Sequence, residues 1–236
     1  MRVEQFILEN YSLFTRIVEI LAAVTGLILF KKYKSTTAKY FIFFLLYLSI
    51  GDLLNTYTKL IRNNGVLSFL EGTVFAQNYW WSTLFWKIGA ILFFVFYYQK
   101  ILKTEIFRKI IKYSGFIFIT VSVFYILIHW NYFFSRFFPI ISIMGAIIIF
   151  LCTAFYFFET LQSDRILTFY KSINFYISAA IFIWWLIITP IVFYDIYGEH
   201  RDIAYIHLRR YIYLFANICM YLTFTFALIW CKPETN

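Results

Sequence analysis

Four charged residues lie inside stretches of sequence that are otherwise apolar. They are Arg16, Glu19, Asp52 and Lys87. At the centre of a membrane helix each such charge costs about 2.5–3.5 kcal/mol, so each is expected to have a partner or a water-accessible cavity. Intramembrane charges mark ligand sites, ion paths or proton relays. These four residues are therefore the first candidates for a functional site.

The four charges are expected at a similar depth. Counted at 1.5 Å per residue from the expected helix ends, they lie roughly 8–12 Å below one face of the membrane. Asn55 shares a helix face with Asp52, and Asn217 in the last apolar stretch reaches a comparable depth. The candidate ligand- or ion-binding residues are Arg16, Glu19, Asp52, Asn55, Lys87 and Asn217.

Polar residues also recur at helical spacing, because residues three or four apart share a face. Five such faces are expected to meet inside a helical bundle, where small and polar side chains favour helix contact. The faces are Ser12, Arg16, Glu19, Ala23 and Gly26; Ser49, Asp52, Asn55 and Lys59; Thr83, Lys87 and Ala90; Asn174, Ser178, Trp185 and Thr189; and Arg210, Tyr213, Asn217 and Tyr221.

Two interpretations of the charges stand side by side. In the first they only pair, Arg16 with Glu19 one turn away and Asp52 with Lys87 across two helices, which gives no net buried charge and specifies packing. In the second they line a water-accessible pocket that binds a polar ligand or passes an ion or a proton. Both interpretations expect Asp52 and Lys87 to interact directly.

The sequence carries no catalytic or cofactor signature. A retinal protein needs a lysine within its last helix, whereas Lys232 lies beyond that helix, and a zinc protease needs His-Glu-x-x-His, which is absent. Asp52 has no second intramembrane aspartate to form an aspartyl dyad. The histidine cluster of ceramidase-type hydrolases and the Pro-Gln signature of SWEET-type transporters are also missing. We therefore expect no enzyme, no cofactor and no metal.

The composition requires lipid as the solvent of this chain. Of its residues 62% are hydrophobic, 25% are aromatic and only 14% are charged, and the mean hydropathy is +0.74. The formal charge of +9 does not indicate nucleic-acid binding, because the basic residues sit in short segments between apolar runs. Three widely spaced cysteines, Cys152, Cys219 and Cys231, form neither a disulfide framework nor a metal site. They are expected to pack as small apolar residues.

Apolar stretches of membrane length predict a single all-α domain of seven transmembrane helices over residues 1–236. We place the helices at roughly 11–30, 39–58, 78–98, 110–130, 137–159, 171–194 and 209–231. The fourth and fifth are expected to form a tight hairpin around Asn131 to Arg136. The longest loop, about 59–77, contains Asn63, Asn64 and Gly65 and a short apolar piece from Val66 to Leu70 that is expected on the membrane surface.

Lysine and arginine are distributed unequally between the two sides of these helices, and the richer side is expected to be cytoplasmic. Twelve are on one side: Lys31, Lys32, Lys34, Lys39, Lys100, Lys103, Arg108, Lys109, Lys112, Arg165, Lys171 and Lys232. Seven are on the other: Arg2, Lys59, Arg62, Arg136, Arg201, Arg209 and Arg210. This predicts the N-terminus outside and the C-terminus in the cytoplasm, with the candidate residues nearer the outside.

Four segments resemble a diffuse group of small, uncharacterised bacterial seven-helix membrane proteins. They are Ile50-Gly51-Asp52-Leu53-Leu54, the loop Asn63-Asn64-Gly65, Phe96-Tyr97-Tyr98-Gln99-Lys100-Ile101-Leu102, and the last helix from Ala216-Asn217-Ile218 to Ala227-Leu228-Ile229-Trp230-Cys231. The resemblance extends over most of the chain. It implies a bacterial inner-membrane location.

Three classes of function follow from these observations. The first is a non-enzymatic sensor of a small ligand, or the membrane subunit of a signalling or defence system, since a bundle without a soluble output domain must signal through loops such as Lys100 to Lys112. Its partners would be lipid and a cytoplasmic or membrane protein, or further copies of the chain. The second is a small transporter or an ion or proton channel that uses the Asp52 and Lys87 region. A membrane-embedded enzyme is the third and least favoured.

Overall fold

The computed structural model describes residues 6–7, 10–61, 65–197 and 203–233. Within these ranges the chain is helical without strands, and seven helical segments are long and apolar enough to cross a membrane. The prediction of an all-α, multi-pass helical bundle is confirmed at this level. Asn63 and Asn64, together with Arg2, Arg62 and Arg201, lie outside the described residues.

The seven spans are formed by single helices or by short runs of helices. The first is α2 (Tyr11–Ile28), and the second combines α4 (Ala38–Asn55) and α5 (Tyr57–Ile61). The third combines α6 (Tyr79–Ser82), the π-helix η3 (Thr83–Gly89) and α7 (Ala90–Ile101). The remaining four are α8 (Glu105–Ile128), α10 (Pro139–Leu161), α11 (Ile173–Tyr197) and α12 (Ile203–Trp230).

The predicted boundaries agree with these helices to within a few residues, except at two helix starts. The fourth span begins at Glu105 rather than near 110, and the last begins at Ile203 rather than near 209. The extension of the fourth span carries the charged residues Glu105, Arg108 and Lys109, and the extension of the last span is cut off from the apolar stretch by Arg209 and Arg210. The helices therefore continue past the apolar stretches that reveal them.

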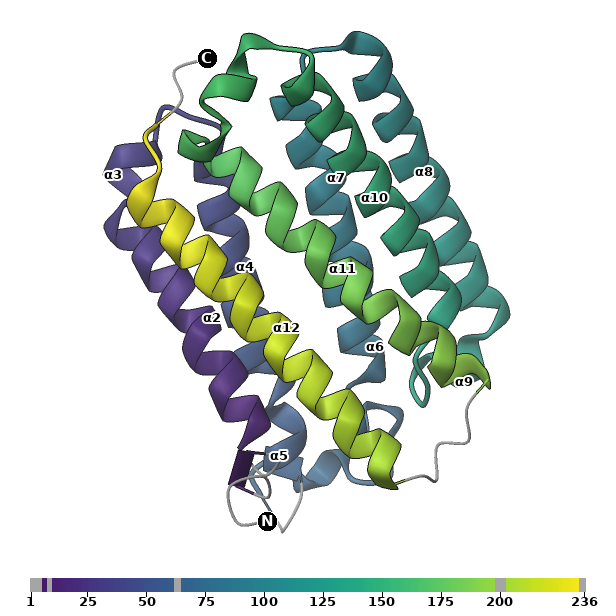
Figure 1. Ribbon diagram of the computed structural model, residues 1–236. Coiled ribbons are helices and arrows are strands. Elements are labelled where there is room, and N and C mark those ends of the chain that lie inside the picture. The colour runs from purple at the N-terminus through teal and green to yellow at the C-terminus, as the bar shows by residue number, and fades with distance from the viewer. Residues whose placement is uncertain (1–5, 8–9, 62–64, 198–202, 234–236) are drawn as a thin grey trace.

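The helices pack as two groups that α11 connects (Figure 1). In one group α2 lies between α4 and α12, and in the other α7, α8 and α10 contact one another. Helix α11 packs along α10 on one side and α12 on the other. The fourth and fifth spans form the expected hairpin, joined through the short helix α9 (Trp130–Phe133).

The first and last spans fix two ends of the bundle. Helix α2 begins at the lower end in Figure 1, and α12 finishes at the upper end beside α3 (Phe30–Tyr33). We call these the N-terminal end and the C-terminal end. The described part of the second loop, with the 3-10 helices η1 (Ser68–Leu70) and η2 (Val74–Ala76), belongs to the N-terminal end. The turns η4 (Asp164–Leu167) and η5 (Phe169–Lys171) belong to the C-terminal end.

Aromatic side chains fill much of the interior. Phe44 stacks on Phe93 with ring centroids 3.9 Å apart, and Phe41 packs edge-to-face on Phe224 at 4.9 Å. The outward faces are also apolar, with Ile28 74% exposed, as expected for surfaces that contact lipid rather than water. Packing of rings and aliphatic side chains therefore holds most of the bundle together.

Candidate functional site

The first charge cluster joins the first, second and last spans. Arg16 on α2 donates from Nε to Oδ2 of Asp52 on α4 at 2.8 Å, and each side chain is about one quarter exposed, at 23% and 24%. Glu19, one turn after Arg16, interacts with both of these charges and with the Tyr221 side chain on α12. We call Arg16, Glu19 and Asp52 the negative cluster, because it contains two carboxyl groups and one guanidinium.

Glu19 is the most buried member of the negative cluster. Only 2% of the residue is exposed, and its Oε1 has no hydrogen-bond partner. The neighbouring buried residues on α2 are Ala22, Ala23 and Gly26, small side chains that let adjacent helices approach closely. The cluster thus combines a satisfied ion pair near the surface with a carboxyl group deeper in the interior that retains unused bonding capacity.

The expected pairing of the four charges is wrong. Asp52 pairs with Arg16 instead of Lys87, and among the described residues Glu19 forms no ion pair with Arg16. Depth along a helix does not by itself decide which residues pair, because the rotation of the helix about its axis sets which neighbour each side chain faces. Asp52 and Lys87 lie on consecutive spans, but the side chain between those spans is Phe85, which lies directly against Gly51.

Lys87 belongs to a second cluster at the N-terminal end. Its Nζ lies 4.8 Å from the centre of the Phe137 ring, just before α10, and it interacts electrostatically with Arg209 and Asp195. Arg209 on α12 forms an ion pair from Nη2 to Oδ2 of Asp195 on α11 at 2.9 Å. Tyr205 donates its hydroxyl to Oδ1 of Asp195 at 2.7 Å. We call Lys87, Asp195 and Arg209 the positive cluster, because it contains two cations and one carboxylate.

The π-helix η3 positions Lys87. Phe85 stacks on Tyr47 of α4 with ring centroids 3.9 Å apart, and the Tyr47 hydroxyl donates to the Phe85 carbonyl at 3.0 Å. Trp81 donates from its indole nitrogen to the Gly51 carbonyl at 3.1 Å. A Cβ on Gly51 would overlap the Phe85 ring, so only glycine permits this contact. Single stretches of π-helix are rare and often occur at functional sites.

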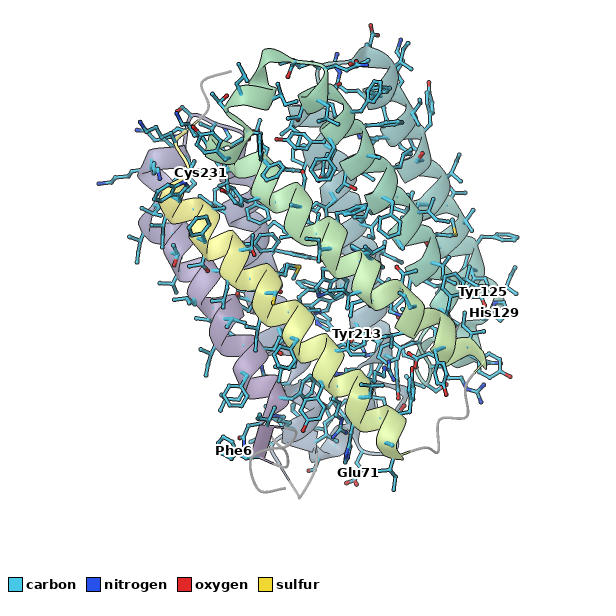
Figure 2. The ribbon with its side chains drawn as sticks, viewed as in Figure 1. Phe6, Glu71, Tyr125, His129, Tyr213 and Cys231 are labelled. Carbon is cyan, nitrogen blue, oxygen red and sulfur yellow. The ribbon has the colours of Figure 1, made fainter. Side chains whose placement is uncertain are left out.

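The two clusters do not form a single pocket. Helix α12 adjoins both, through Arg209 of the positive cluster and through Tyr221, which interacts with Glu19 of the negative cluster. Arg209 and Tyr221 are separated by roughly 18 Å at 1.5 Å per residue. In Figure 2 Tyr213, between them, lies in the lower half of the bundle, and Cys231 lies at the opposite end. Lys87 therefore belongs with Asp195 and Arg209, and among the described residues its expected contact with Asp52 is not formed.

The two candidate asparagines lie apart from the ionised groups. Asn55 accepts a hydrogen bond at its Oδ1 from Asn78 Nδ2 at 2.8 Å, which ties the end of α4 to the start of α6. Asn217 accepts one from the Trp184 indole nitrogen at 2.7 Å, which ties α12 to α11. Each asparagine has a structural partner on the neighbouring span. Of the six candidates, only Arg16, Glu19 and Asp52 are brought together.

Sequence reasoning missed Asp195, Arg209 and Tyr205 as members of a site. The last helix was expected to start at Arg209, so that residue was counted among loop charges. In the structure it lies well inside α12. A signal was present in the spacing of Tyr205, Arg209 and Tyr213, which recur every four residues and so share one helix face.

At the C-terminal end, hydrogen bonds join α12 to α3. Tyr33, which is fully buried, donates its hydroxyl to the carbonyls of Leu228 at 2.9 Å and Cys231 at 2.8 Å. Lys32 donates to the carbonyls of Leu228 and Ile229 at 3.2 and 3.0 Å. These bonds satisfy carbonyls that a helix leaves unpaired in its last turn, and they bring a cation to its negative end. A second polar contact nearby joins Tyr97 to Asn174 at 2.6 Å.

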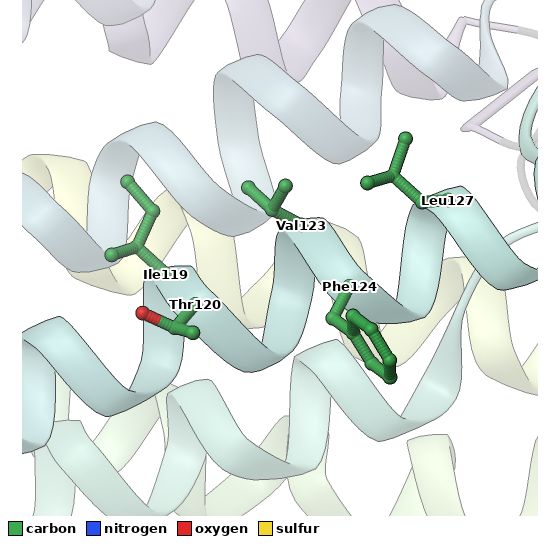
Figure 3. Close-up of a pocket in the computed structure, with 5 residues that line it drawn as sticks. All are labelled: Ile119, Thr120, Val123, Phe124 and Leu127. Carbon is green, nitrogen blue, oxygen red and sulfur yellow. The ribbon is translucent and has the colours of Figure 1, made fainter.

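Two surface hollows lie away from the charges. One has a volume of about 380 Å³ and is lined by a single face of α8: Ile119, Thr120, Val123, Phe124 and Leu127 (Figure 3). The other, of about 340 Å³, lies between α11 and α12, with Trp184 and Phe215 in its wall. Both are apolar and open to the outer surface of the bundle. Their chemistry fits lipid chains rather than a polar ligand.

Comparisons of this chain with protein-family models, with curated proteins and with solved structures give no match.

Proposed function

We propose that the chain is a non-enzymatic membrane protein that senses a small, positively charged ligand, either as a sensor in its own right or as the membrane subunit of a signalling or defence system. The supporting observation is Glu19, which is 2% exposed and has an unpartnered carboxylate oxygen beside one guanidinium and a second carboxylate. A buried carboxyl group whose charge is not fully compensated takes up a proton or binds a cation. A cation or a proton bound at Glu19 would balance the negative cluster.

The surroundings of Glu19 favour a ligand that enters and leaves by one end. Arg16 and Asp52 are partly exposed and form the polar approach to Glu19. Toward the C-terminal end the interior is closed by packed rings, since Phe41 contacts both Phe224 and Tyr97. A continuous polar path, which a transporter or channel needs, would have to open through these rings. This supports binding over passage.

The α2 and α12 pair offers a route for the signal. These helices pack along each other, with Glu19 and Tyr221 at one contact and the Lys32 and Tyr33 hydrogen bonds at the far end. A ligand that changes the contact of Glu19 with Tyr221 would bias the position of α12. A partner protein bound at the C-terminal end would respond to the change in the position of α12. Two such positions of α12 are what the proposal requires.

We further propose that the protein lies in a bacterial inner membrane with its N-terminal end outside. The support is the excess of lysine and arginine at the C-terminal end, where loops such as that of Lys103 would face the cytoplasm. In this orientation the negative cluster opens to the outside. The ligand would then be an extracytoplasmic cation or proton. Reporter fusions test the orientation, because a reporter after Lys103 should report the cytoplasm and one after Asn64 the outside. The reverse result would overturn the proposed orientation.

The binding test measures thermal unfolding of the purified protein in detergent. Sodium, potassium and the bulky cation N-methylglucamine are compared at equal ionic strength, and each series is repeated at neutral and mildly acidic pH. A ligand at one hundred times its dissociation constant adds about 2.7 kcal/mol to the free energy of unfolding. We expect such a gain from a small cation or from acid in the wild type and not in Glu19→Gln. Glu105→Gln, at an exposed site, is the matched control.

An equal response of the wild type and Glu19→Gln would refute the proposed ligand site. A gain with sodium or potassium at neutral pH identifies a metal cation, whereas a gain with acid alone identifies a proton. The protein is also placed in liposomes, and cation and proton flux are recorded. Flux through the chain alone that Glu19→Gln abolishes would replace the sensor by a transporter or channel.

A further inference from the structure

The Lys87 ammonium carries a positive charge that no described residue neutralises by direct contact. It forms no ion pair or hydrogen bond within the described part of the chain, and its ring contact is the face of Phe137 at 4.8 Å. A cation over an aromatic face gains less than a charge costs in the interior of a membrane bundle, so the ring alone does not compensate the ammonium. Lys87 is therefore undercompensated in this structure.

Asp195 already serves as the counter charge of Arg209. Its Oδ1 accepts the Tyr205 hydroxyl, and its Oδ2 is held by Arg209. Both carboxylate oxygens are thus already engaged, although Asp195 and Lys87 interact through space. The positive cluster consequently retains one unbalanced positive charge, which points to an anion as its missing component.

A second polar group on the same π-helix is also unused. Thr83 is fully buried, and its Oγ1 has no hydrogen-bond partner. It precedes Lys87 by four residues, nearly one turn of a π-helix. Buried hydroxyls are normally hydrogen-bonded, so an unpaired one beside an unbalanced charge indicates a polar component that both would contact.

We propose that the positive cluster binds the phosphate group of an anion, with Lys87 and Arg209 as the cations that hold it. Lysine is a compact point charge suited to phosphate, and Arg209 keeps guanidinium N–H groups beyond the Nη2 that binds Asp195. The Lys87 side chain reaches Phe137, in the loop before α10, so the ammonium is carried toward the N-terminal end of the bundle. The phosphate belongs to an anionic phospholipid or to a soluble phosphate compound.

The site is independent of the proposed cation sensor. It lies on η3, α11 and the first turns of α12, whereas Glu19 lies on α2, and the two clusters have opposite charge imbalance. Loss of one function therefore leaves the other measurable. A protein that binds phosphate but no cation would refute only the sensor.

The experiment uses the full chain purified in detergent and in lipid nanodiscs. Inorganic phosphate is titrated against the detergent sample at constant ionic strength with chloride as the reference. Nanodiscs of phosphatidylcholine with and without phosphatidylglycerol test the lipid source, and retained phosphatidylglycerol is counted by native mass spectrometry. Thermal unfolding reports binding of either probe.

Lys87→Gln should weaken binding about fivefold, the share of one basic residue at a charged lipid surface. Lys87→Arg should restore it, and Lys34→Gln, at an exposed site of the C-terminal end, should leave it unchanged. Without a probe, Lys87→Gln should unfold at the wild-type temperature or above it, because an unbalanced charge is removed. Binding of inorganic phosphate alone identifies a soluble ligand, and binding of phosphatidylglycerol alone identifies a lipid. If neither probe binds, or if Lys87→Gln binds both as the wild type does, the phosphate site is wrong.

Discussion

The negative and positive clusters each hold one charge beyond an ion pair, and they place that charge in different surroundings. Each has an ion pair between two spans, Arg16 with Asp52 and Arg209 with Asp195, and each adds one further charge. In the negative cluster the extra charge is Glu19, which is buried among small side chains of α2. In the positive cluster it is Lys87, which covers an aromatic ring. The comparison shows that a helical bundle can hold one unpaired charge either among small buried side chains or against an aromatic ring.

The surroundings differ because the side chains differ in reach. The Glu19 side chain is short and ends in the interior, so its surplus charge can be balanced only by something that enters. The Lys87 side chain is long enough to carry its charge toward the end of the bundle, and its stem packs against apolar groups on the way. The first arrangement suits a small cation or a proton, and the second suits a larger anion.

The largest expected effect is from removing the cation of the negative cluster. Arg16→Gln leaves Glu19 and Asp52 without a counter charge, and we expect a loss of about 3 kcal/mol of unfolding free energy, at the low end for buried pairs because the pair is partly exposed. Chemical or thermal unfolding in detergent measures it. The double variant Arg16→Met with Asp52→Met should lose less than Arg16→Gln. A double variant that loses the sum of the two single variants would show that the residues act independently.

A smaller loss is expected when the carboxylate of the positive cluster is removed. Asp195→Asn leaves two cations together, but Arg209 is 35% exposed and part of its charge is solvated. We expect a loss of about 2 kcal/mol, within the range for an orphaned charged hydrogen bond. Adding Lys87→Gln to this variant should recover part of the loss, measured by the same unfolding assay. No recovery would mean that Lys87 is balanced by another group.

The next effect concerns the contact that separates the clusters. Gly51→Ala places a methyl group against the Phe85 ring, and we expect a loss of about 1–2 kcal/mol through overpacking. The stack of Phe85 on Tyr47 should be disturbed at the same time. Gly26→Ala is the control, because its added carbon would lie 3.1 Å from the nearest atom of Ile42 and so needs only a small shift, whereas the carbon added at Gly51 would overlap the Phe85 ring. Equal unfolding temperatures for the two variants would contradict the role of Gly51.

The smallest effect is expected at an ion pair outside both clusters. Lys109 and Glu105 lie one turn apart on α8 at 2.8 Å, and their side chains are 64% and 68% exposed. Exposed pairs of this spacing contribute about 0.3–0.5 kcal/mol. Lys109→Gln should therefore change the unfolding free energy by no more than that. A loss as large as that of Asp195→Asn would show that ion pairs anywhere in this chain are equally important, and the distinction between the clusters and the surface would fail.

The helical spans could be predicted well from sequence because lipid imposes a simple requirement. A run of about 20 apolar residues is needed to cross the membrane, and each of the seven helices contains one. What apolar length could not reveal is where a helix begins when charged residues such as Arg209 and Arg210 interrupt its sequence. The six residues from Ile203 to Leu208 belong to α12 and were expected in a loop.

The site was harder to predict, because pairing depends on helix rotation and neighbours as well as on depth. The faces with Arg16 and with Asp52 were correctly expected to point inward, and their contact follows from the packing of α2 against α4. The partners of Lys87 could not be found in the same way. They lie on α11 and α12, which adjoin η3 only in the folded bundle, and the π-helix has no recognised sequence signal.

That π-helix also changes the direction in which side chains point along the third span. Each wide turn of η3 holds more residues than an α-turn, so the residues after Gly89 point in directions shifted from those that a regular helix would give them. The π-helix itself carries Lys87, which faces the groups of the N-terminal end, and α7 after it directs Tyr97 and Tyr98 toward Asn174 and Ser178. A regular α-helix of the same sequence could match only one of these two registers. The π-helix in the third span therefore lets the side chains at each end of the bundle point toward their own set of polar partners.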